Sequence, residues 1–241
     1  RYVCVWDAAS GGGGSGGGLT VVKSKSENNT SYFAMLHRKK RGPHGHFDAL
    51  SVVLEKNNSR FLIDSGGPYD YGSEMRYEYF MSSYAHNVLL INERPHQKGA
   101  IFIGSRQMNS DVFIVEAEHK GYSPITHKRT CIIIEKIGLI VIDKLFGVCE
   151  PVDIKLLWHF DPDCVIDLAN NRITNQLESI EFSSSENNYS ITSGNENGIF
   201  KSWVTDKISN KIASPMLINQ LETDADVTII SAFGNNCQIK C

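Results

Sequence analysis

The chain has 241 residues, of which 41% are hydrophobic and 21% are charged. This balance is typical of a globular protein with a substantial core, and it excludes disordered and collagen-like chains. The formal net charge of -3 provides no overall basic field, so we expect no nucleic-acid partner. Charged or polar residues interrupt each apolar run before the roughly 18 residues that a membrane-spanning helix requires, so we expect no membrane span either.

The first 18 residues differ in composition from the rest. Residues 11–18 read GGGGSGGG, a run that can bury nothing and is typical of a flexible linker or a long loop. Two interpretations stay open: a natural loop, or an engineered linker that joins an N-terminal strand segment to the domain. We predict a boundary here, with residues 1–18 as strand segment plus linker and residues 19–241 as one domain.

From residue 19 onward the chain is a succession of short β-branched and aromatic runs, such as LTVVKSK, ALSVVLEK, VFIVEAE and VTIISAF. No segment keeps apolar residues at a spacing of 3.6 over three turns, so the pattern favours strands. KNNS (56–59) and KIG (136–138) are turn signals that predict antiparallel hairpins. More than a dozen strands exceed one open sheet, and we therefore predict an all-β protein, a large antiparallel β-sandwich of two packed sheets.

Three segments concentrate the residues that could carry chemistry: GPHGHFD, LIDSG and YAHN. If His44 and His46 lie on a strand, they point to the same face. Asp64 follows an apolar run and His86 precedes one, so both are expected at strand ends, where a sandwich presents functional loops. Two imidazoles and a carboxylate form a ligand set that suits Zn²⁺. Ordinary hydrogen-bonded turn residues are the alternative.

Other polar and aromatic features have weaker signals. The basic run Arg38–Arg41 precedes the first histidine segment, where it could attract a polyanion or form a solvated turn. The run Trp158–Phe160 could stack on a sugar, but core packing is the better interpretation because strand side chains alternate. His37, His96 and His119 lie in no motif, so we expect them at the surface.

A resemblance to a known family rests on three blocks: HGHFDALS, LIDSGGPYDYG and RYEYFMSSYAHNVLLIN. In this order they resemble the C-terminal β-sandwich of the heparinase II/III-type polysaccharide lyases, a group to which certain alginate lyases are also similar. A later block that includes His127 and Arg129 is similar to the family's paired strands with an H-x-R segment, and LLWHFDP resembles the strand that follows. The resemblance covers roughly residues 19–235.

The resemblance implies a metal site and a neighbouring catalytic residue. It makes His46, Asp64 and His86 the ligands, with zinc as the expected ion and the organisation of the cleft as its expected role. His44 matches the histidine that faces the substrate and assists catalysis in such lyases. A metal ligand two residues away would hold His44 in place.

The same carry-over suggests residues that act on the sugar. Tyr79 falls near the tyrosine that the family's sandwich places at the cleft, with Tyr71 and Tyr77 as competitors. We expect Arg41 and Arg76 to bind the anionic polysaccharide substrate.

The implied reaction is β-elimination on a polysaccharide that contains uronic acid. It requires neutralisation of the uronate carboxylate, a base for the C5 proton and an acid for the leaving oxygen. Tyrosine and histidine can serve as base and acid when the site tunes their pKa values.

In these lyases a helical (α/α) toroid precedes the sandwich and supplies further catalytic residues. This sequence has no amphipathic helical repeat, so we expect it to be the sandwich half of a longer bacterial enzyme, inactive alone and located in the periplasm or outside the cell. Two other functions stay open. One is a non-catalytic carbohydrate-binding or scaffold module with a structural metal, and the other is a hydrolase that uses zinc-bound water.

Overall fold

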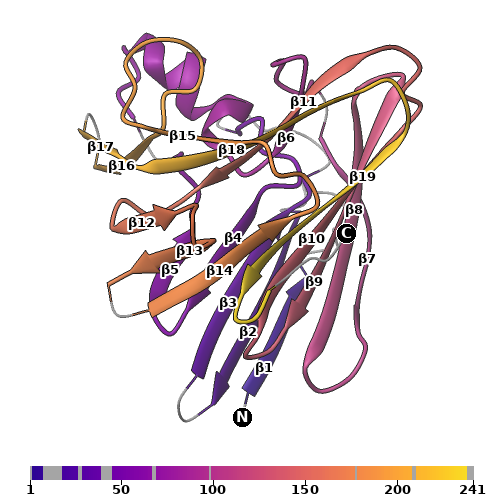
Figure 1. The fold of residues 1–241 in the computed structure, drawn as a ribbon, viewed down its shortest axis with the longest axis vertical. Coiled ribbons are helices and arrows are strands. Elements are labelled where there is room, and N and C mark those ends of the chain that lie inside the picture. Colours follow the sequence, from indigo (N-terminus) through magenta and orange to yellow (C-terminus); the bar gives the residue numbers. More distant parts are fainter. Residues whose placement is uncertain are drawn as a thin grey trace.

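The structure is a computed structural model that describes residues 2–7, 18–26, 29–38, 45–66, 69–97, 99–176, 178–207 and 210–237. Within these residues the chain forms nineteen strands and two short helical segments (Figure 1). Neighbouring strands in all of the sheets pair antiparallel, so the prediction of an antiparallel all-β fold is confirmed. No helix in the described part of the chain is long and apolar enough to cross a membrane.

The first large sheet has five strands in sequence order: β1 (Tyr2–Asp7), β2 (Leu19–Ser26), β3 (Asn29–Leu36), β4 (Val52–Lys56) and β5 (Ser59–Leu62). β1 pairs with β2 along its whole length, so the residues before the glycine-rich run belong to this sheet. Residues 8–17 lie outside the described residues. The KNNS hairpin is confirmed, because Asn57 and Asn58 connect β4 to β5 with φ of 50° and 64°, the left-handed values that tight hairpin turns require.

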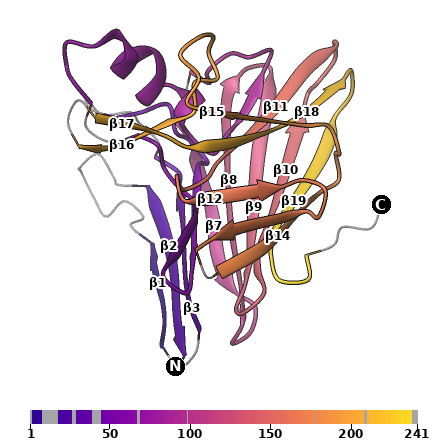
Figure 2. The same cartoon turned by 60° about the vertical axis from the view of Figure 1, so that its left-hand side comes forward.

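The second large sheet has eight strands in the order β12-β13-β14-β19-β10-β9-β8-β7. They are β7 (Ile101–Gln107), β8 (Val112–Tyr122), β9 (Ile125–Ile134), β10 (Gly138–Phe146), β12 (Cys164–Asp167), β13 (Arg172–Asn175), β14 (Glu178–Ser184) and β19 (Val227–Gly234). Along β9 buried and half-buried residues alternate strictly, as in a strand with one face on the core. Figure 2 shows the strands β1–β3 and β8–β10 as two facing walls.

A four-stranded sheet and a hairpin accompany the two large sheets. The sheet has the order β15-β18-β11-β6, with β6 (Leu89–Ile91), β11 (Val152–His159), β15 (Tyr189–Ser193) and β18 (Pro215–Thr223). The hairpin consists of β16 (Trp203–Lys207) and β17 (Asn210–Ala213). Trp158, His159 and Phe160 are all fully buried, so their prediction as core residues is confirmed.

Two short helical segments were not predicted. A π-helix, η1 (Arg76–Phe80), and a 3₁₀ turn, η2 (Ser83–Ala85), lie between β5 and β6. Five and three residues are too few to show a helical period in the sequence. In Figures 1 and 2 this helical region lies at the end of the molecule opposite the N-terminal end of β1.

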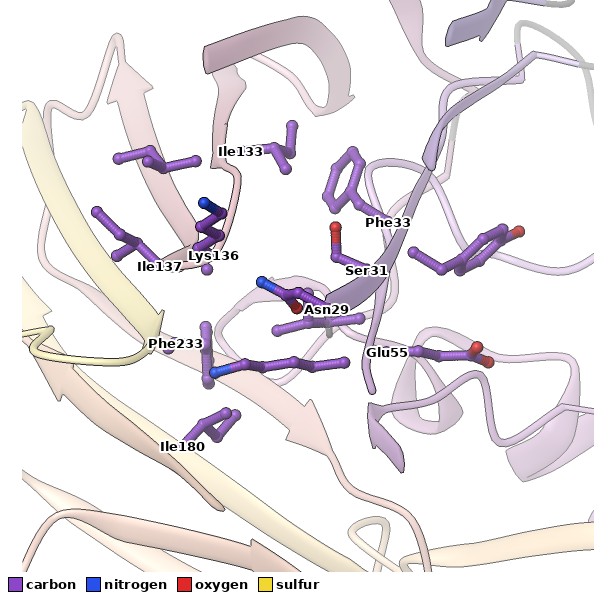
Figure 3. Close-up of a pocket in the computed structure, with 15 residues that line it drawn as sticks. Asn29, Ser31, Phe33, Glu55, Ile133, Lys136, Ile137, Ile180 and Phe233 are labelled. Atoms are coloured by element: carbon purple, nitrogen blue, oxygen red, sulfur yellow. The ribbon is translucent and has the colours of Figure 1, made fainter. Parts of the chain in front are cut away.

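One extensive apolar cluster joins the large sheets, with Phe33 and Leu54 from the first and Ile133 and Phe233 from the second. Two smaller clusters lie around Leu157 and Phe80. At the end where β3 begins, the sheets leave a small cavity of about 20 Å³. Figure 3 shows Phe33 on one of its sides and Ile133 on another. The space holds roughly one water molecule, which is too little for a sugar.

Candidate metal centre

The opposite end of the sandwich brings together the three predicted ligands. His46 lies in the loop between β3 and β4, Asp64 lies two residues beyond β5, and His86 directly follows η2. One potential ligand atom from each side chain lies within 4.8 Å of the other two. Segments separated by 18 and 22 residues in the sequence therefore form one constellation.

Asp64 and His86 form a close pair. Nδ1 of His86 lies 3.2 Å from Oδ2 of Asp64, and the His86 side chain is fully buried whereas 30% of the Asp64 side chain is exposed. Burial opposes the charge on both groups, but their attraction outweighs it, so the pKa of His86 is raised and the pKa of Asp64 is lowered. The carboxylate is therefore ionised and available as a ligand over the neutral pH range.

His46 completes the group from the other side. Its ring centroid lies 5.2 Å from that of His86. Burial, followed by the nearby His86, lowers the pKa of His46 to about 4. At neutral pH the ring is uncharged, which is the form that binds metals.

Gly66 allows this close packing. A Cβ atom at this position would lie 2.8 Å from Cε1 and Nδ1 of His46 and 2.9 Å from the carbonyl oxygen of Phe80. The Gly66 amide donates a 2.8 Å hydrogen bond to Oδ1 of Asp64. One residue thus orients the carboxylate and leaves room for the imidazole.

The donor set fits a zinc ion. It combines two imidazoles with a carboxylate, the nitrogen and oxygen ligands that zinc prefers. In addition, Nε2 of His86 is buried without a hydrogen-bond partner among the described residues. Buried polar nitrogens normally have a partner, so a metal ion would satisfy a requirement that the protein leaves open.

A cavity of about 80 Å³ adjoins His46. Its polar lining includes Arg38, Asp48, His96 and Gln97. Arg38 lies 3.2 Å from Asp48, and 39% of its side chain is exposed whereas Asp48 is almost fully buried. Arg38 therefore places an accessible cation beside the candidate metal centre.

The structure describes only some of the predicted catalytic and substrate-binding residues. His44 and Arg41 lie outside the described residues. Tyr79 is fully buried, and its hydroxyl accepts a 3.0 Å hydrogen bond from the Trp203 amide and donates to the Trp203 carbonyl. Burial raises the pKa of Tyr79 well above its usual value. The structure therefore argues against the predicted catalytic role, because this hydroxyl has no access to a substrate.

The neighbouring aromatic residues are accessible. Tyr71 is 63% exposed and Tyr77 is 59% exposed, so both competitors of Tyr79 face solvent. Arg76 is buried instead, with its guanidinium 4.1 Å from the Tyr71 ring centre and a 2.9 Å hydrogen bond from Nη1 to the Tyr69 carbonyl. Arg76 fixes this loop, which argues against its prediction as a substrate-binding residue.

The prediction that three histidines lie at the surface is wrong. His37, His96 and His119 are each at most 3% exposed. His96 shows how such rings are satisfied: Nε2 accepts from the Ala49 amide, and Nδ1 lies 3.0 Å from the Ser83 hydroxyl. The neighbours of a single histidine in the sequence do not reveal which distant segment supplies its hydrogen-bond partner, so no local pattern indicated this burial.

Asn87 is a site residue that we did not predict. Its side-chain amide donates to the carbonyls of Val52 and Ile63, at 2.7 and 2.9 Å, and its side-chain oxygen accepts from the His159 amide. The only signal in the sequence is its position next to His86. Asn87 thus ties the start of β4, the end of β5 and the end of β11 to the segment with His86.

The sequence profile of the family described as "Heparinase II/III-like, C-terminal" matches residues 15–233. No curated protein matches the chain in sequence. The chain has the fold of part of the heparan sulfate lyase HepC from Pedobacter heparinus, with 16% identity and a TM-score of 0.76 over 91% of this chain and 35% of that one. The structure of a heparinase III is similar as well, with 18% identity and a TM-score of 0.74 over 90% of this chain and 35% of that one.

A 4-alpha-glucanotransferase from Thermococcus litoralis is also similar, with 7% identity and a TM-score of 0.55 over 97% of this chain and 39% of that one. At such identities the likeness shows the fold alone, and unrelated activities share folds. The chain spans about 35% of the length of the two lyase structures. Function must therefore be argued from the site.

Proposed function

The chain belongs to the heparinase II/III-like C-terminal family, as its motifs predict, and we propose that it is the β-sandwich part of a polysaccharide lyase with zinc bound by His46, Asp64 and His86. The observation that carries the proposal is the convergence of these three side chains, with one donor atom from each within 4.8 Å of the others. When bound, zinc supplies a fixed positive charge that links three loop segments. Its role here is to organise the cleft.

The proposed substrate is a polysaccharide that contains uronic acid, and the proposed reaction is β-elimination. A base removes the C5 proton, the electron pair of that C–H bond forms the C4–C5 double bond, and the C4–O bond breaks. An acid protonates the leaving oxygen. Stabilisation of the charge that develops on the uronate carboxylate supplies much of the rate.

Several residues of this chain suit parts of that reaction. Arg38 offers a partly exposed guanidinium at the cavity beside His46, so it can attract a carboxylate or sulfate group of the sugar. We propose His44 as the proton-transfer group of this half, on the basis of its motif. Tyr77 and Tyr71, which are exposed, replace Tyr79 as candidates for the cleft tyrosine.

The rest of the active site belongs to another part of the enzyme in this proposal. This chain covers only about 35% of the length of the matched lyase structures. A preceding helical toroid would supply the remaining catalytic groups. We therefore expect the chain alone to bind zinc and to show little or no lyase activity.

Metal analysis after exhaustive dialysis tests the metal site, and absorbance of unsaturated uronate products tests the activity. About one zinc per chain, lost in His46→Ala, is the expected result. Absence of bound zinc at micromolar concentrations would refute the site. Robust turnover by this chain alone would contradict the division of the active site between two parts, and saturated products would indicate a hydrolase.

A non-catalytic carbohydrate-binding or scaffold module is the second candidate. Tyr79 and Arg76 are buried, so two of the residues predicted to face the substrate cannot contact it. This burial favours the non-catalytic module. The two functions differ in the role of His44. In the complete lyase, His44→Ala abolishes product formation while zinc stays bound, whereas in a scaffold module the same change has no effect on function.

A further inference from the structure

A buried ion pair lies beneath the metal centre, on the inner face of the eight-stranded sheet. Arg129 of β9 and Asp143 of β10 are direct neighbours across the strand pair, and both side chains are fully buried. Nε of Arg129 donates to Oδ1 of Asp143 at 2.7 Å, and Nη2 donates to Oδ2 at 3.0 Å. This two-point contact fixes the plane of the guanidinium.

The remaining terminal nitrogen of Arg129 points toward the loops of the other sheets. Nη1 donates to the carbonyl of Leu50 at 2.8 Å and to the carbonyl of Asn87 at 2.6 Å. Leu50 lies four residues after His46, and Asn87 directly follows His86. One nitrogen atom thus joins the segments that carry both imidazoles.

The backbone conformation of Leu50 indicates that the segment contacted by Arg129 is tightly constrained. Leu50 has φ of 68°, a left-handed value that leucine adopts only under constraint. Its side chain is fully buried, and its carbonyl is held by Arg129. Packing and the hydrogen bond together keep the turn in a conformation that the residue itself disfavours.

The third ligand segment joins through Asn87. The Asn87 side chain donates to the Ile63 carbonyl at 2.9 Å, and Ile63 directly precedes Asp64. Arg129 therefore contacts the His86 segment directly and reaches the Asp64 segment through one intervening residue.

We propose that Arg129, oriented by Asp143, is a positioning residue that sets the distances among the three metal-binding segments. The inference rests on the proposed zinc site and extends it to residues that make no contact with the ion. Stability is a poor explanation for such a pair, because well-packed apolar residues are often as stabilising as a buried ion pair. A role in supporting metal ligands from outside the first coordination sphere explains why two charges are buried here despite the cost in desolvation. It also explains why they lie next to the metal-binding segments.

The test compares zinc affinity with stability in the full chain. Zinc is removed with a chelator, and the dissociation constant is measured by titration against a chromophoric competitor. Arg129→Lys keeps the positive charge but cannot contact both carboxylate oxygens and both carbonyls. We expect zinc binding to weaken roughly 10- to 100-fold, the range found when outer-sphere partners of metal ligands are lost. The absorption spectrum of the cobalt-substituted protein should change as well, since it reports the ligand geometry.

Two controls separate positioning from a general loss of stability. Ile180→Ala removes a buried side chain beside the cavity at the far end, so it lowers the melting temperature without touching the metal segments. Arg106→Lys makes the same chemical change in an exposed pair with Glu116. Both controls should bind zinc as the unsubstituted chain does.

If Arg129→Lys does not fold, Arg129→Met combined with Asp143→Asn serves instead, because it removes both buried charges together. Unchanged zinc affinity and an unchanged cobalt spectrum in a folded Arg129 variant would overturn the positioning role while leaving the zinc site intact. If the unsubstituted chain binds no zinc, the proposed function fails first and the inference fails with it.

Discussion

The two halves of the β9–β10 strand pair have opposite characters. In one half the core-facing residues are Cys131 and Ile133 of β9 and Leu139 of β10, all buried and apolar. In the other half the core-facing positions hold the charged pair Arg129 and Asp143, with His127 beside them and the apolar Leu145 opposite His127. Both halves are equally buried, so the difference lies in chemistry and not in exposure.

The polar half is fully paired, and its hydrogen bonds define the protonation of its histidines. Nδ1 of His119 accepts from the Gly121 amide, so Nε2 carries the proton and donates to Nδ1 of His127, 3.1 Å away. His127 then donates from Nε2 to Asp143 at 2.6 Å. Both rings are neutral, and the Asp143 charge is balanced by Arg129. The comparison teaches that apolar packing holds the sandwich together, whereas polar pairing determines where its loops lie.

The largest expected effect concerns acid, because buried neutral histidines bind protons less readily than the same residues in the unfolded chain. Burial lowers the pKa of His96 and of His159 to about 3 and lowers that of His119 well below its usual value. The unfolded chain therefore binds more protons below pH 6.5, and stability is retained above that pH and lost as the pH falls. Each ring contributes up to about 1.4 kcal/mol per pH unit, so the three together contribute at most about 4 kcal/mol per pH unit.

Urea unfolding followed by circular dichroism between pH 7 and pH 5 measures this dependence. His159→Gln is the matched variant, because its amide can still donate to the Tyr84 carbonyl that His159 contacts. It should reduce the slope by up to about 1.4 kcal/mol per pH unit, with the larger reduction toward pH 5. A stability that does not change over this range would show that the histidines are not neutral and buried in solution.

Loss of a ligand charge is the next largest effect. Asp64→Asn keeps the shape of the side chain and an oxygen for the Gly66 amide, but removes the charge that binds a cation. We expect zinc affinity to fall by more than the roughly 100-fold that outer-sphere losses reach. Asp70→Asn is the control, since Asp70 accepts from the Gly72 amide in the same local pattern and is exposed. Equal zinc affinity in both variants would remove Asp64 from the ligand set.

A smaller effect should follow from crowding the His46 ring. Gly66→Ala places a methyl group 2.8 Å from that ring, so the imidazole must move. We expect roughly tenfold weaker zinc binding, which corresponds to about 1.4 kcal/mol. Gly104→Ala on β7 meets no atom within 4 Å and should leave affinity unchanged. Calorimetric titration of both variants with zinc measures the difference, and a Gly66→Ala protein with full affinity would show that the ring is not tightly placed.

The role of Tyr79 separates structure from catalysis. Tyr79→Phe loses the two hydrogen bonds that tie η1 to Trp203, and we expect it to destabilise the chain by about 1 kcal/mol. In the complete lyase its activity should stay close to normal, whereas Tyr77→Phe tests an exposed hydroxyl. Product formation that disappears in Tyr79→Phe but not in Tyr77→Phe would restore the original prediction.

The apolar strands of the sandwich could be predicted from the sequence better than its polar contacts. Runs such as those of β8, β9 and β10 alternate clearly, so the fold class and the KNNS hairpin followed from local pattern. Short strands were missed, for example β12 and β13, because four residues with mixed polarity carry little periodic signal.

The candidate site was predicted through its motifs but not through its contacts. The spacing of His46, Asp64 and His86 cannot indicate that they meet, since their proximity depends on how three separate loop segments pack. The roles of Arg129 and Asn87 were invisible for the same reason, because each acts on backbone carbonyls from distant segments. Tyr79 was assigned by resemblance, and its burial follows from packing against the β16 strand, which sequence motifs do not record.

The smallest expected effect concerns the β4–β5 turn, which lies at the end of the sandwich away from the metal centre. Asn58, in the turn between β4 and β5, has φ of 64°, which glycine adopts without steric cost. Asn58→Gly creates an Asn-Gly turn, the sequence that this type of hairpin favours most. We expect a gain of about 0.5 kcal/mol in thermal or urea unfolding, with zinc affinity unchanged. A change in zinc affinity would mean that the β4–β5 turn and the metal centre are coupled through β4. The apolar packing and the polar pairing of the sandwich would then not act independently.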